Sequence, residues 1–156
     1  MVVNVVEEMG VRELREADRR AGSDAELAER LAAAYYGLDH APDVADWFDA
    51  RDTGLGTKME VKSAHLSVGD DHPAEGRFRL WRSQLRSLTA SRSSGSGTTW
   101  VVFVVFDGER PTVMRRMHAR TARRIVEETV GWGPSGHEEW DVQAKVPLDA
   151  VFDAVE

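Results

Sequence analysis

Glu60 and Lys62 are separated by one residue in a segment that is typical of a β-strand, where they alternate with the apolar residues Met59 and Val61. Because residues two apart in a strand share a face, the carboxylate and the ammonium point the same way, while Met59 and Val61 face the core. A second carboxylate from a neighbouring strand would allow this group to hold a divalent cation and a phosphate together. Glu-x-Lys alone is common on solvated strand faces, so its meaning depends on what lies beside it.

Three aspartates precede this pair and could supply the second carboxylate: Asp43, Asp46 and Asp49. Asp46 stands near the start of the preceding predicted strand, and Asp43 follows a proline. Asp49 would lie roughly opposite Glu60 in a hairpin that turns at the intervening glycines. Asp46 and Asp49 would face opposite sides of a regular strand, so one metal ion could not easily use both.

An upstream acid followed by an apolar–acid–apolar–lysine pattern resembles the core motif of the PD-(D/E)xK nuclease superfamily, which includes restriction endonucleases and archaeal Holliday junction resolvases. The resemblance covers about residues 24–106. It implies a restriction endonuclease-like fold and a metal-dependent DNA endonuclease. Asp46, placed where the family has its aspartate, and Glu60 would bind Mg²⁺ or Mn²⁺, and Lys62 would orient or activate the attacking water.

The resemblance also implies residues outside this motif. Some members add a glutamate from the first helix, for which Glu26 is the first candidate and Glu29 the alternative. Some members place a glutamine on the helix after the motif, where this chain has Gln84. The resemblance also leads us to expect a homodimer, because cutting two strands with one site per chain calls for two-fold symmetry. The alternatives are a non-catalytic nucleic-acid-binding or assembly module with the same fold, and a structural protein with a coincidental motif.

The charge distribution favours a nucleic-acid partner more than the total of −7 does. Residues 1–75 carry a net charge of −9, residues 76–126 carry +9, and residues 127–156 carry −7. Every basic residue of the middle block is arginine, whose planar guanidinium matches phosphate. The predicted DNA-backbone contacts are Arg77, Arg79, Arg82 and Arg86, followed by Arg115, Arg116, Arg120, Arg123 and Arg124.

The apolar periodicity predicts an α/β fold with a mixed sheet flanked by helices, in one domain over residues 1–156 with its core at about 24–130. The continuous apolar run from Trp100 to Phe106 predicts a strand buried on both faces. Phe78, Trp81, Leu85 and Leu88 follow one another at helical spacing. The predicted helices cover residues 11–20, 23–36, about 78–88 and 120–130, and the predicted strands cover 44–51, 58–68, 100–106, 112–117 and 142–146.

Composition adds expectations about the compartment. The chain has no cysteine, which excludes disulfides and thiolate metal sites and predicts an intracellular, cytoplasmic protein. No apolar run is long enough to span a membrane, so no membrane partner is expected. Arginine outnumbers lysine 17 to 3 and acids are abundant, a combination that resembles proteins of halophilic archaea and their viruses.

Overall fold

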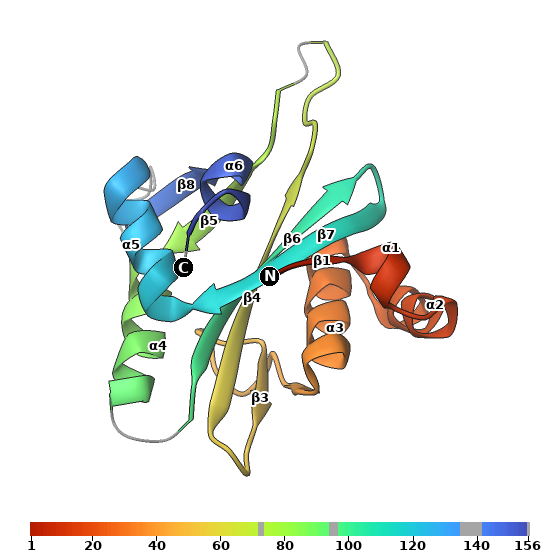
Figure 1. Ribbon diagram of the computed structural model, residues 1–156, viewed down its shortest axis with the longest axis horizontal. Helices are drawn as coiled ribbons and strands as arrows, with labels where there is room; N and C mark the ends of the chain where they lie inside the picture. The colour runs from red at the N-terminus through yellow and green to blue at the C-terminus, as the bar shows by residue number, and fades with distance from the viewer. Residues whose placement is uncertain (72–73, 94–96, 135–141, 156) are drawn as a thin grey trace.

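The structure is a computed structural model that describes residues 1–71, 74–93, 97–134 and 142–155. A mixed sheet has the strand order β1-β7-β6-β4-β3-β2, and a separate two-stranded sheet pairs β5 with β8 (Figure 1). The strands are β1 (Val2–Asn4), β2 (Asp39–His40), β3 (Ala50–Asp52), β4 (Thr57–His65), β5 (Arg77–Trp81), β6 (Thr99–Asp107), β7 (Arg110–His118) and β8 (Gln143–Pro147). The helices are α1 (Val5–Glu8), α2 (Val11–Arg20), α3 (Asp24–Tyr36), α4 (Arg82–Ser93), α5 (Ala119–Thr129) and α6 (Leu148–Phe152).

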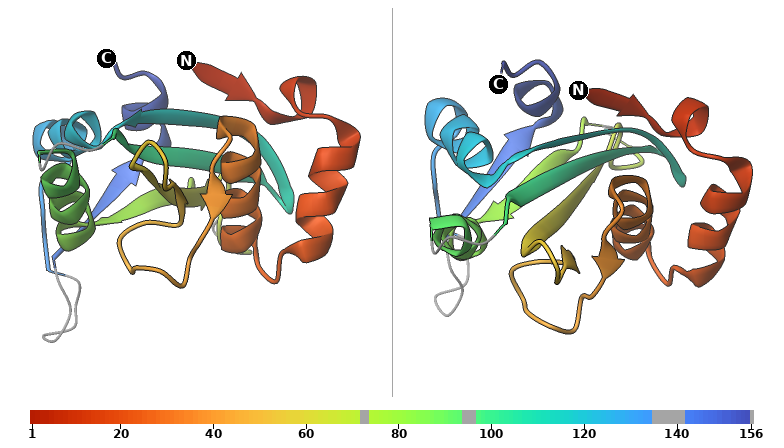
Figure 2. Two further views of the ribbon diagram at one scale, coloured as in Figure 1. Left: turned by 90° about the horizontal axis from the view of Figure 1, so that it is seen from below. Right: turned by 60° about the horizontal axis from the view of Figure 1, so that its bottom comes forward.

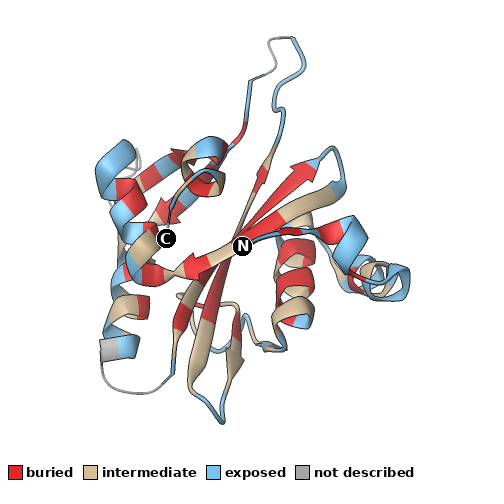
Figure 3. Ribbon diagram, in the orientation of Figure 1, coloured by how far each residue is buried: buried red, intermediate tan, exposed pale blue. Residues whose placement is uncertain are grey.

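Strand β6 is the centre of the larger sheet, parallel to β4 on one side and antiparallel to β7 on the other. Its side chains enter two apolar clusters in alternation, because neighbouring residues of a strand point to opposite faces. Phe103 packs in the cluster with α4, α5, α6 and the β5–β8 sheet, whereas Val102 packs in the cluster with α2 and α3. The prediction of a strand buried on both faces is confirmed (Figure 3).

Helices therefore cover both faces of the sheet, as Figure 2 shows from two directions. Helix α3 lies against one face through buried positions that include Leu27, Ala28 and Leu31. Ser23 caps the start of α3 by accepting a hydrogen bond from the backbone N–H of Glu26, and Gly37 ends the helix in the left-handed conformation at φ 73°. Among the described helices, none is long and apolar enough to cross a membrane.

The β3–β4 hairpin is short, so one edge of β4 has no strand beside it beyond Met59. Ala50 pairs with Met59 and Asp52 with Thr57, but β4 continues to His65 without β3 beside it. The strand predicted over residues 44–51 is wrong for its first part, because regular β3 begins only at Ala50. The chain before β3 is irregular, so the strict alternation assumed for Asp46 and Asp49 does not apply.

The helix predicted over about residues 78–88 is also wrong for its first part. Residues 77–81 form strand β5, and α4 begins only at Arg82. Phe78 and Leu80 are buried while Arg77 and Arg79 are exposed, which is the alternation of a strand. Residues 77–81 form a strand because they pair with β8, which lies far along the chain. The sequence patterns also did not predict β1 and α1 at the N-terminus.

Gly76 brings β5 close to the end of β4. Its backbone N–H donates to the carbonyl of His65 at 2.9 Å, and a Cβ atom placed on Gly76 would lie 2.2 Å from that carbonyl oxygen. Only glycine fits so close an approach of two backbones. The residues that follow it on β5 are thereby held beside the open edge of β4.

Candidate active site

A hollow of about 450 Å³ lies on the open edge of β4, between α3, the segment before β3, and β5. The polar and charged side chains of its lining include three carboxylates and three cations: Glu29, Asp49, Glu60, Lys62, Arg77 and Arg79. The Glu-x-Lys pair identified from the sequence is therefore inside the hollow. Glu60 is buried, with 5% of its surface exposed.

Asp49 is held in the hollow by the backbone of β4. Its Oδ2 accepts a hydrogen bond from the N–H of Val61 at 2.8 Å. The pairing of β3 with β4 reaches only to Met59, so no backbone carbonyl of β3 accepts from the N–H of Val61. The Asp49 carboxylate accepts this hydrogen bond instead. The register of Ala50 with Met59 puts Asp49 opposite Glu60, as hairpin geometry predicted.

Asp46, the aspartate preferred from the sequence, does not line the hollow. Its side chain is exposed, and its backbone carbonyl accepts a hydrogen bond from Nε2 of Gln84 at 2.9 Å. Asp43 is exposed as well. The backbone of Asp46 thus supports Gln84, a partner of Lys62, while its own carboxylate is exposed to solvent.

Lys62 is fixed by two partners. Its Nζ lies 3.0 Å from Oε1 of Glu60 and donates to Oε1 of Gln84 at 2.7 Å. Gln84 is fixed in turn by Asp46, so a chain of contacts sets the direction of the ammonium. A lysine ammonium has three N–H donors, and within the described part of the chain two are taken, which leaves one for a phosphate oxygen.

The carboxylates of the hollow are electrostatically unfavourable neighbours. Burial raises the pKa of Glu60 to about 8, with Lys62 opposing the shift and Asp49 adding to it. Burial also raises the pKa of Asp49, against the hydrogen bond from Val61. Carboxyl groups so placed ionise together only when a cation joins them.

We expect Glu60→Gln to stabilise the protein at pH 8 in the presence of chelator. Glu60 ionises near pH 4.5 in the unfolded chain but keeps its proton to about pH 8 in the folded protein. Between these values the folded state binds more protons, so the free energy of unfolding falls as pH rises. The variant escapes this loss and should be more stable than wild type by up to roughly 4 kcal/mol at pH 8, with little difference near pH 4.

Urea unfolding at both pH values measures this difference. Glu128→Gln is the control, because Glu128 is an exposed residue of α5. A gain for Glu60→Gln that does not change with pH would contradict the electrostatic account.

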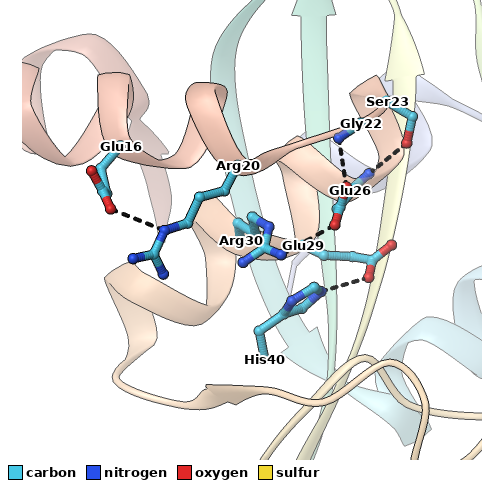
Figure 4. Close-up of polar contacts among 8 residues, drawn as sticks. All are labelled: Glu16, Arg20, Gly22, Ser23, Glu26, Glu29, Arg30 and His40. Carbon is cyan, nitrogen blue, oxygen red and sulfur yellow. Dashed lines mark hydrogen bonds and ion pairs between the residues drawn. The ribbon is translucent and has the colours of Figure 1, made fainter.

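Helix α3 brings Glu29, and not Glu26, to the hollow. Figure 4 shows the contacts of these two glutamates, with Glu26 beside Gly22 and Glu29 beside His40. Glu26 accepts from the backbone N–H of Gly22 at 2.5 Å and pairs with Arg30 at 3.2 Å, so it serves the start of the helix. These contacts, the Gly22 N–H first, lower the pKa of Glu26. Glu29 lies one turn further along and its Oε1 is 2.9 Å from Nε2 of His40.

The Glu29–His40 contact joins α3 to the edge strand β2. Both side chains are largely buried, at 18% and 13% exposure. Burial raises the pKa of Glu29, with the His40 contact opposing this shift and the charge of Asp49 adding to it. Sequence reasoning missed His40, because its role depends on a contact between separate elements. His40 stands in a loop-like segment with no motif around it.

The arginines predicted to contact DNA separate into groups. Arg77 and Arg79 are exposed and line the hollow, whereas Arg82 and Arg86 of α4 are not among its lining residues. Arg115 of the second set is buried, and its guanidinium donates to the carbonyls of residues 151, 152 and 154. It holds the C-terminal segment, so it is not available to a phosphate and this part of the prediction is wrong.

The donor set fits a hard divalent cation. Carboxylate oxygens are the ligands that Mg²⁺ and Mn²⁺ prefer, and Mg²⁺ is commonly held by one or two carboxylates together with substrate phosphate. The described residues contain no group of three histidine, cysteine, aspartate or glutamate side chains already gathered around a metal position. Asp49 and Glu60 together are the pair that such an ion would join, with the remaining ligands supplied by water and phosphate.

Comparison with protein families agrees with the fold and with the motif in the hollow. A model of the PD-(D/E)XK nuclease superfamily domain matches residues 15–153, so the chain belongs to this superfamily. The mixed sheet flanked by helices is consistent with a restriction endonuclease-like core. No curated protein matches the chain. Membership supports a nuclease-type function and leaves the substrate and the ion to be proposed.

Proposed function

We propose that this protein is a metal-dependent DNA endonuclease that hydrolyses phosphodiester bonds in the hollow on the edge of β4. The observation that carries the proposal is the placement of Lys62 beside Glu60, with Asp49 directly before the neighbouring strand β3. An acidic residue together with a Glu-x-Lys pair is the motif of the superfamily to which the chain belongs. Asp49 takes the position that the sequence alone gave to Asp46.

Each residue has a role that follows from its contacts. Asp49 and Glu60 hold the cation, with Glu29 as a third carboxylate in the lining. When bound, the ion polarises the phosphoryl oxygen and lowers the pKa of water. The ammonium of Lys62, held by Gln84, stabilises the charge that develops on the phosphate. Arg77 and Arg79 bind the flanking DNA backbone.

The protein acts as a homodimer in this proposal, since one hollow per chain can cut one strand of a duplex or junction at a time. Arg77 and Arg79 offer exposed guanidinium groups to phosphates, and phosphate contacts recognise the shape and backbone of a nucleic acid and not its base sequence. This favours a structure-specific, junction resolvase-like activity over a restriction-type one.

Cleavage of a labelled panel tests the function. The panel contains a linear duplex, a single strand, a flap and a four-way junction, each with Mg²⁺, with Mn²⁺ and with chelator, at low and high salt. We expect cutting that requires the metal and is fastest on the junction. Equal cutting of the linear duplex at a fixed sequence would favour the restriction-type activity. Salt-sensitive binding with no cutting would instead support a non-catalytic nucleic-acid-binding module.

A further inference from the structure

The two-stranded sheet β5–β8 carries a group of cations on its outer face. Phe78 and Leu80 of β5 point to the core, and Arg77 and Arg79 point out. On β8 the same alternation leaves Lys145 exposed. The antiparallel register places Lys145 directly opposite Arg79.

This arrangement is unfavourable without an anion. Like charges directly opposite on neighbouring strands destabilise the pair. Within the described part of the chain, no carboxylate lies within ion-pair distance of Arg77, Arg79 or Lys145. Lys145 is also the one basic residue of the segment 127–156, which carries eight acidic residues. The fold therefore places the one basic residue of this acidic segment opposite Arg79.

A second hollow adjoins the first along these cations. It has a volume of about 490 Å³, and its lining includes His65, Glu75, Arg77, Arg79 and Lys145. Ser63, Arg77 and Arg79 line both hollows, so the second continues from the first along β4 and β5. The close approach at Gly76 fixes β5 against the end of β4 and so keeps the two hollows adjacent.

We infer that the second hollow binds the nucleic-acid strand next to the bond that is cut, with Lys145, Arg79 and Arg77 contacting its phosphates. The inference rests on the proposed nuclease function and extends it. The first hollow takes the reacting phosphodiester, and the strand leaves along the β5–β8 sheet on the side of Lys145. Backbone phosphates are the anions that match this row of cations, because they repeat along a strand as the cations do along the two hollows.

The experiment compares a substrate that has no neighbouring phosphate with one that has several. Bis(p-nitrophenyl) phosphate is a single phosphodiester and has no second phosphate to offer to the second hollow. The second substrate is the oligonucleotide cut best in the panel. We expect Lys145→Ala to leave hydrolysis of the small diester unchanged and to raise KM for the oligonucleotide about tenfold. In chelator, the slope of log binding constant against log salt should fall by about 1.

Two further variants make the result specific. Arg12→Ala removes an exposed cation on α2, which does not line either hollow, and should change neither KM nor the salt slope. Lys145→Arg keeps the charge and should restore wild-type values. Lys145→Ala with the same KM and salt slope as Arg12→Ala would overturn the inference. If the protein cuts nothing, the nuclease proposal fails, but the salt slope still decides: a slope lowered by Lys145→Ala supports the binding surface, and an unchanged slope or no binding overturns it.

Discussion

Lys62→Ala is expected to abolish metal-dependent cleavage, with a loss of at least about 100- to 1000-fold in single-turnover rate, because a preorganised charge beside the reacting phosphate contributes on this scale. Folding and most DNA binding should remain, since Lys62 is one cation among several around the hollow. The rate on the preferred oligonucleotide, the melting temperature and the Kd in chelator together measure this.

Lys58→Ala is the matched control on the same strand. Lys58 donates to the hydroxyl of Ser91 at 2.8 Å and lies over the ring of Trp47, away from the carboxylates. Its loss removes the same charge from β4 and should change the rate by less than about threefold, as expected for a side chain that does not contact the reacting group. Full activity of Lys62→Ala would contradict the assignment of this hollow as the active site.

The second large effect separates the two aspartates. We expect Asp49→Asn to lose about 100-fold or more in cleavage rate and to lose the rise in melting temperature that Mg²⁺ or Mn²⁺ gives the wild type. An asparagine oxygen can still accept from the Val61 N–H, so the fold should persist while the charge is gone. Asp46→Asn should remain within about threefold of wild type, because the contact of Asp46 with Gln84 is made by its backbone.

Both variants are assayed with the same oligonucleotide and the same metal titration. The opposite outcome, an inactive Asp46→Asn beside an active Asp49→Asn, would restore the preference drawn from sequence. It would also require the segment that contains Asp46 to move toward the hollow when metal binds.

Local patterns carried the parts of the prediction that were confirmed. The alternation around Glu60 and Lys62 and the apolar run of β6 each lie within a few residues, so strand periodicity alone predicts which side chains share a face. The opposition of Asp49 and Glu60 followed from the hairpin, because a short turn fixes the register of its strands.

The wrong and missing parts of the prediction depend on pairing between residues that are far apart in the sequence. Phe78 fitted a helical stripe because the partner that makes it a strand residue, Val146, is far away in sequence. The choice between Asp46 and Asp49 depended on how far β3 extends, which backbone contacts decide and side-chain types do not. Lys145 and His40 lie far from the motif in sequence, and only tertiary structure places His40 beside Glu29 and Lys145 beside the basic face of β5.

The parallel pairing of β4 with β6 has a consequence for how the protein is made. A parallel pair needs a crossover, and here the crossover contains β5, which brings Arg79 to the hollow, and α4, which brings Gln84 to Lys62. On the ribosome, residues 57–65 emerge first and must wait for residues 99–107 before the strand has its central partner. A nascent chain that ends before β6 therefore contains every carboxylate of the hollow, but its strand β4 lacks the partner that it has in the folded protein. In the proposed nuclease, cleavage is therefore expected only after β6 has been made and paired with β4.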